Sequence, residues 1–162
     1  MRRRETGFTL VELMIAVGII AILAAIAVPN LLTAINRAKQ KRTMADMRSI
    51  SSAWEARATD LARYNAAGVA GISTVITIDD VAAMIAPTYI KEVPRYDGWS
   101  RQFNCYIDRP LSGPAANGYA IISGGRDGSV STTVYLGPFA SFDCDIIFSN
   151  GAFLAYPEGV QQ

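Results

Sequence analysis

Residues 7–32 read GFTLVELMIAVGIIAILAAIAVPNLL, and this stretch decides the architecture of the 162-residue chain. From Phe8 to Val28 it holds 21 residues, of which only Thr9 and Glu12 are polar. A helix of that length reaches about 30 Å, which is the thickness of the hydrocarbon core of a bilayer. The sequence therefore predicts a membrane-spanning helix.

A secretory signal peptide also has a basic start followed by an apolar run. Its apolar part is usually about 7 to 15 residues long and ends at a small-residue cleavage site. Here the run ends at Pro29-Asn30 instead, and a helical pattern continues beyond it. We therefore expect the segment to be retained, with a kink or a melted turn at Pro29, because proline lacks a backbone donor and crowds the preceding turn.

The composition favours a structural protein over an enzyme. Apolar residues make up 51% of the chain and charged residues 18%, which is enough apolar material for one core besides the membrane segment. The net charge of +1 gives no general attraction to nucleic acid. The chain has no His, the commonest general base and metal ligand, and it carries no nucleophile or phosphate-binding motif.

Glu12 is the exception in the apolar run, where a carboxylate costs about 2.5 to 3.5 kcal/mol on insertion scales. In one interpretation it lies near the membrane surface and reaches the head groups. In the other it meets a cation at the same depth. A cut between Gly7 and Phe8 would create an α-amine at Phe8, four residues before Glu12 and on the same helix face. That amine, on this chain or on a neighbour, could neutralise Glu12 and set the register of packed helices.

The pattern beyond residue 29 predicts an amphipathic second half of the helix over residues 30–64, followed by a globular head over 65–162. Its apolar stripe consists of Met47, Ile50, Trp54, Ala58 and Leu61. Its polar face begins with Arg37, Lys39, Lys41 and Arg42. We interpret that face as a solvated surface with ion pairs to other subunits, in preference to a site for lipid or nucleic acid.

The head is expected to belong to the α+β class. Residues 65–75 read as a loop, and Thr77 with Asp80 predicts a capped short helix over 79–85 that Pro87 closes. An irregular connector follows over 87–100. Strands are predicted at 102–107, 119–123, 134–136, 146–148 and 153–156, with turn signals between them.

Residues 7–32 resemble the prepilin signal, which is the N-terminal segment of type IV pilins and type II secretion pseudopilins. The resemblance implies that residues 1–7 are a cytoplasmic leader, which a prepilin peptidase removes by cutting between Gly7 and Phe8. It further implies that Phe8 is N-methylated and that Glu12 assists assembly. The mature segment over 8–29 then serves first as a membrane anchor and later as the filament core.

The same resemblance implies a long N-terminal helix packed on a small antiparallel sheet. The protein would cross the inner membrane once, with its head in the periplasm, before joining a periplasmic or extracellular filament. The implied partners are further copies in a helical homopolymer, the prepilin peptidase, an inner-membrane assembly platform and minor pilins or pseudopilins. No nucleic acid is implied.

The second half resembles the major pseudopilin of type II secretion. The matching pieces are residues 93–100, 118–128 and 143–146, although Gly98 and Ser100 depart from the pattern, and the segment between Asp127 and Asp145 is longer than expected. Major pseudopilins bind calcium here, and calcium takes six to eight oxygens. The implied ligands are Asp127, Asp143 and Asp145. The alternative is a hairpin turn at Asp127-Gly128 beside two surface carboxylates.

Cys105 and Cys144 are expected to pair if the head lies outside the cytoplasm, and type IV pilins often carry such a disulfide. The cysteines thus favour a pilin, whereas the calcium pattern favours a pseudopilin. Our first interpretation is a filament-forming major-pseudopilin-like subunit of a type II secretion system. The alternatives are a type IV pilin for adhesion or twitching motility, and a membrane-anchored binding domain that does not polymerise.

Overall fold

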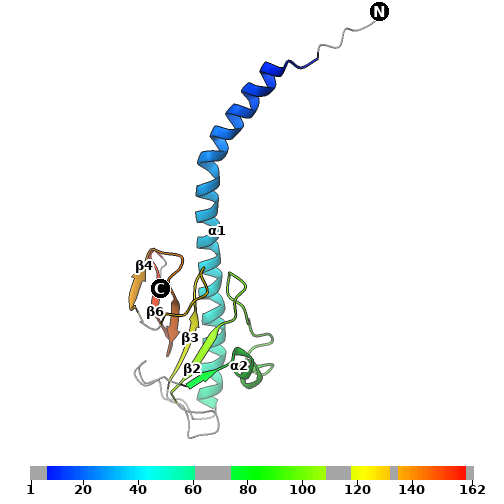
Figure 1. The fold of residues 1–162 in the computed structure, drawn as a ribbon. Coiled ribbons are helices and arrows are strands. Elements are labelled where there is room, and N and C mark those ends of the chain that lie inside the picture. The colour runs from blue at the N-terminus through cyan, green and yellow to red at the C-terminus, as the bar shows by residue number, and fades with distance from the viewer. Residues whose placement is uncertain (1–6, 61–73, 109–117, 132–134, 160–162) are drawn as a thin grey trace, which may run out of the picture. The chain divides into compact units, whose positions relative to one another are not determined.

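The structure is a computed structural model that describes residues 7–60, 74–108, 118–131 and 135–159. The chain divides into two compact units, Met1–Ile35 and Asn36–Gln162. The long helix α1 (Leu10–Asp60) contributes residues to both units (Figure 1). The predicted end of this helix at residue 64 lies outside the described residues.

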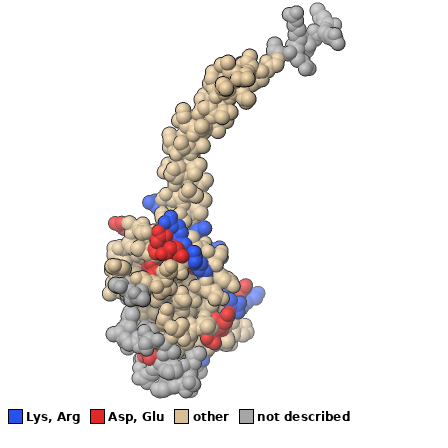
Figure 2. Space-filling model, viewed as in Figure 1, with Lys and Arg blue, Asp and Glu red and all other residues tan. Residues whose placement is uncertain are grey.

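The first unit consists of the apolar part of α1. Its large apolar side chains are all exposed within the single chain, from Leu10 to Ile35. Charged side chains gather over the second unit in Figure 2, whereas the helical segment of the first unit is tan in that view. The helix is long and apolar enough to cross a membrane. Such a surface is stable only against lipid or against other helices.

The helix runs through Pro29 without interruption, so the predicted melted turn is wrong, while a kink there stays a prediction. Proline cannot donate to the carbonyl of Ala25, which lies one turn earlier. Nearby side chains supply additional bonds along this turn. Asn30 Nδ2 donates to the carbonyl of Ile26 at 3.2 Å, and Thr33 Oγ1 donates to the carbonyl of Pro29 at 3.0 Å.

In the second unit, the rest of α1 packs into the core of the head. Met47, Ile50, Trp54 and Ala58 are all buried, which confirms the predicted stripe as far as the described residues reach. Met47, Ile50 and Trp54 share one core cluster with residues of the strands. The ring of Trp54 lies 4.8 Å from that of Tyr119, measured between ring centroids, so the helix is fixed on the sheet by an aromatic contact.

The short helix α2 (Ile78–Ile85) confirms the predicted capped helix. Thr77 is its N-cap, and its hydroxyl accepts from the backbone N–H of Asp80 at 3.1 Å. The Asp80 carboxylate in turn accepts from the N–H of Thr77 at 2.9 Å. This reciprocal capping box satisfies donors that a helix N-terminus leaves open. The chain leaves the helix through a cis Ala86–Pro87 bond.

A six-stranded sheet has the order β1-β2-β3-β5-β6-β4. The strands are β1 (Thr74–Ile76), β2 (Asn104–Ile107), β3 (Tyr119–Ser123), β4 (Gly137–Phe139), β5 (Ile146–Ser149) and β6 (Ala152–Pro157). The head is therefore α+β, as predicted. The expected antiparallel pairing holds between β1 and β2, β2 and β3, β3 and β5, and β5 and β6. The sheet is nevertheless mixed, because β4 pairs with β6 in parallel.

Two local expectations are also wrong. Thr74 and Val75 were expected in a loop, but they form the edge strand β1. The strand expected at 134–136 begins at Gly137 instead, and Leu136 is exposed before it. Local propensity favours Tyr and Leu over Gly and Pro in strands. An edge strand nevertheless accepts Pro138, because proline lacks only the donor that an edge leaves unused.

Candidate functional site

The candidate assembly segment begins with a second capping box, at the start of α1. The N–H and the hydroxyl of Thr9 both donate to Glu12 Oε2, at 2.9 and 2.7 Å. The N–H of Glu12 donates back to Thr9 Oγ1 at 3.2 Å. This is the Thr-x-x-Glu signature, in which two side chains satisfy the open donors of a helix N-terminus.

Phe8 lies before the helix in this structure, because α1 begins at Leu10. The predicted placement of Phe8 and Glu12 on one helix face is therefore not formed within this chain. Glu12 instead makes both side-chain bonds through Oε2 to Thr9. Among the described residues, Oε1 accepts no hydrogen bond, so it is free to accept from an amine of another subunit.

Gly7 and Phe8 show no structural role within the described part of the chain. A Cβ added at Gly7 would meet no atom within 4 Å, so packing does not require glycine there. Phe8 is 74% exposed. Packing of the described residues therefore gives no reason for a glycine at position 7.

Asp97 organises the connector between α2 and β2, and sequence reasoning missed it. The side chain is only 2% exposed. Its Oδ1 accepts from the N–H of Trp99 at 2.8 Å and from that of Arg101 at 2.9 Å. Its Oδ2 accepts from Ser123 Oγ at 2.6 Å. One buried carboxylate thus joins the connector to the end of β3.

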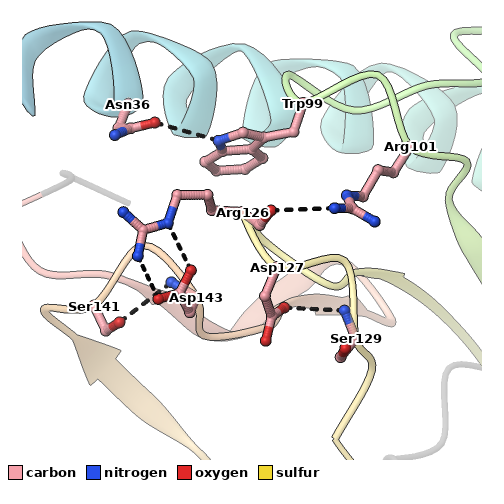
Figure 3. A network of polar contacts seen from close by, with 8 residues as sticks. All are labelled: Asn36, Trp99, Arg101, Arg126, Asp127, Ser129, Ser141 and Asp143. Carbon is pink, nitrogen blue, oxygen red and sulfur yellow. Dashed lines mark hydrogen bonds and ion pairs between the residues drawn. The ribbon is translucent and has the colours of Figure 1, made fainter. Parts of the chain in front are cut away.

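The connector then contacts helix α1. The N–H of Gly98 donates to Thr43 Oγ1 at 2.9 Å, and Trp99 Nε1 donates to Asn36 Oδ1 at 3.4 Å (Figure 3). A Cβ at Gly98 would collide with the carbonyl of Lys39. These contacts explain why Gly98 departs from the proline pattern, since proline has no N–H to donate and would not fit.

The three aspartates of the predicted calcium site lie on two facing loops, residues 124–131 and 140–145. Asp143 forms a bidentate ion pair with Arg126, through Nε–Oδ1 at 2.7 Å and Nη2–Oδ2 at 2.6 Å (Figure 3). This bonding lowers the pKa of Asp143, so the pair persists at neutral pH and is lost as acid protonates the carboxylate. No local sequence pattern predicts this long-range pair.

Asp127 and Asp145 each bind a backbone N–H. Asp127 Oδ1 accepts from Ser129 at 2.9 Å, and Asp145 Oδ2 accepts from Ser131 at 2.8 Å. Burial raises the pKa of Asp145, and the nearby charge of Asp127 raises it further. No group of three or more His, Cys, Asp or Glu side chains converges in the ranges that the structure describes. The arrangement does not fit the predicted set of three carboxylate ligands.

The structure does not form the predicted disulfide, and Cys105 and Cys144 are both free in it. The sheet register explains why. Cys105 on β2 faces Ile121 on β3, which faces Phe148 on β5. Strand β3 lies between β2 and β5, so two strand spacings, about 9.5 Å, separate Cys105 from the strand that Cys144 precedes. A disulfide requires Cα atoms less than about 7 Å apart.

The two thiols should therefore differ in reactivity. Cys105 is fully buried, and burial raises its pKa to about 12, whereas Cys144 is partly exposed. We expect iodoacetamide to modify Cys144 in the folded protein and Cys105 only after unfolding, because the thiolate is the reactive form. Peptide mass mapping checks this. Protection of both cysteines until reductant is added would instead show a disulfide.

Known proteins resemble this chain both in its N-terminal apolar segment and over most of its length. The family profile of the prokaryotic N-terminal methylation motif matches residues 2–28. The chain is 30% identical over 148 residues to the type II secretion system core protein G of Dickeya chrysanthemi, covering 90% of this chain and 85% of that protein. It is 32% identical over 130 residues to the core protein G of Aeromonas hydrophila, covering 80% of each.

A pilin also matches, over a shorter length. The chain is 42% identical over 62 residues to the type IV major pilin protein PilA of Myxococcus xanthus. That match covers 38% of this chain and 28% of the pilin. No solved structure gives a significant match. The similarity to the secretion proteins therefore extends through the head, whereas the pilin match covers less than half of the chain.

Proposed function

Since the chain belongs to the family of the type II secretion system core protein G, we propose that it is the major filament subunit, or major pseudopilin, of such a system. The observation that carries this proposal is the relatedness over both the apolar helix and the head. The relatives are named as core proteins of a secretion system, which favours a component of that system over an enzyme.

The exposed apolar surface of α1 supports a route from membrane to filament. Its apolar side chains from Leu10 to Ile35 find no cover within the chain. Lipid covers them while the subunit is stored in the inner membrane, and helices of other copies cover them in the filament core. Apolar surface stays buried in both states, so transfer does not expose it to water. Repeated contacts that do not close into a ring give an open helical filament.

Processing precedes assembly in this proposal. A prepilin peptidase removes residues 1–7, and the new N-terminus at Phe8 is methylated. The subunit then enters a periplasmic fibre with the help of an inner-membrane assembly platform and minor pseudopilins. The methylation motif over residues 2–28 and the exposed, unpacked Gly7 support this sequence of events.

Replacement of Gly7 by Leu should block the cut. The structure leaves room for the larger side chain, so the variant should insert and fold normally while remaining at full length. Immunoblotting of membrane fractions should show only the longer precursor, and N-terminal sequencing of the wild type should begin at Phe8. A mature wild-type protein that begins at any other residue would contradict the assignment.

Deletion of the gene distinguishes the proposed function from its alternatives. The secretion role predicts that folded exoproteins accumulate in the periplasm and that plasmid-borne wild type restores their release. Secretion that continues while long surface fibres are lost would identify the protein as a type IV pilin, which the match to PilA supports. Retention of both activities would favour an anchored binding domain that does not polymerise.

A further inference from the structure

We propose that the guanidinium of Arg126 joins the two facing loops, residues 124–131 and 140–145, and that these loops keep their conformation without calcium. The ion pair with Asp143 would supply the positive charge that a metal ion supplies between carboxylates. The ion pair stabilises the head whether or not the chain assembles into a filament.

Arg126 is bound at several points. Its guanidinium holds both oxygens of Asp143, in the parallel geometry that is the strongest form of an arginine–carboxylate contact. Its backbone N–H donates to the carbonyl of Phe142 at 2.9 Å. Its own carbonyl accepts from Arg101 Nη2 at 3.4 Å. One residue therefore connects both loops and the connector that precedes β2.

The backbones of the two loops also approach closely beside this ion pair. Gly125 has a φ of +62°, and a Cβ there would lie 2.7 Å from the carbonyl oxygen of Cys144 and 2.8 Å from that of Phe142. Only glycine fits such a position without displacing the backbone. The close approach places the loops where the side chain of Arg126 reaches Asp143.

The carboxylate oxygens are largely committed to N–H donors. Arg126 holds both oxygens of Asp143, and backbone N–H groups hold one oxygen each of Asp127 and Asp145. A calcium ion needs six to eight oxygens with free lone pairs. A cation beside Asp143 would also be repelled by the guanidinium. The N–H donors of Arg126, Ser129 and Ser131 thus make the contacts with these carboxylates that the predicted metal ion would make.

The test uses the mature full-length protein in detergent micelles, with thermal unfolding followed by circular dichroism. The melting temperature of the wild type should be the same in EGTA and in millimolar calcium chloride, and isothermal titration should show no calcium binding. Either a clear rise in melting temperature with calcium or measurable binding would overturn the proposal. The calcium measurements use only the wild-type protein, so they test the proposal even if the substitutions prevent folding.

Arg126→Ala should lower the melting temperature by about 3 °C or more in both buffers, because a bidentate pair is lost. Arg95→Ala is the matched control, since Arg95 holds Asp79 through one contact of 2.7 Å far along the chain from the loops. Its loss should change the melting temperature by less. The swapped variant Arg126→Asp/Asp143→Arg should recover part of the loss. Equal effects of Arg126→Ala and Arg95→Ala would contradict the proposal.

Discussion

Replacing Glu12 with Gln should abolish filament assembly while leaving membrane insertion and cleavage after Gly7 intact. We expect the Glu12 carboxylate to meet the α-amine of Phe8 on an adjacent subunit. Removing one partner of a buried ion pair costs about 3–5 kcal/mol, which corresponds to a loss of assembly of about 100-fold or more. Insertion should be unaffected or improved, because a charge has left the membrane segment. Fibres sheared from cells and quantified by immunoblotting give the measurement.

The capping box makes this substitution selective. Gln serves at the third helical position of a capping box as Glu does, so the contact with Thr9 is preserved. Thr9→Ala is the complementary control, because it removes the cap and keeps the charge of Glu12. It should weaken assembly less than Glu12→Gln. Normal assembly by the Gln variant would show that charge pairing is the wrong explanation. It would favour the alternative interpretation, in which Glu12 lies near the membrane surface and reaches the head groups.

Asp97→Ala should destabilise the head by about 2–4 kcal/mol, the second large effect expected here. The substitution leaves the N–H groups of Trp99 and Arg101 without their acceptor and removes the bond from Ser123. Buried groups that lose their partners each cost about 1–3 kcal/mol. Urea unfolding of the mature protein in detergent, followed by tryptophan fluorescence, measures the free energy of unfolding.

Asp127→Ala is the matched control for Asp97. Asp127 is exposed and accepts one backbone bond from Ser129, so the same chemical change should cost less than about 1 kcal/mol. Asp97→Asn should lie between the two, because its amide oxygen can still accept from Trp99 and Arg101. Equal stability of Asp97→Ala and wild type would show that this carboxylate does not hold the connector.

Local sequence signals predicted the parts of the fold that depend on neighbouring residues. The helical stripe from Met47 to Ala58 was visible because helical spacing places those side chains on one face. The α2 cap was visible because Thr77 and Asp80 interact within one turn. The same spacing rule identifies the capping box of Thr9 and Glu12 at the start of α1.

Contacts between distant segments could not be predicted from one sequence. The bond from Ser123 to Asp97 and the pair of Arg126 with Asp143 depend on how loops from different strands meet. The structure does not form the expected disulfide for the same reason, because strand order, which no local pattern predicts, separates Cys105 from Cys144. The parallel pairing of β4 with β6 likewise could not be predicted, because no local motif indicates the connection that it requires.

Cryo-electron microscopy of fibres from cells that express this chain with its assembly machinery tests the central claim most directly. We predict a helical polymer of copies that begin at Phe8, with the Glu12 carboxylate about 3 Å from the α-amine of Phe8 on an adjacent copy. The apolar part of α1 should form the filament core. Fibres that lack this chain, or a core in which Glu12 faces no amine, would contradict the account.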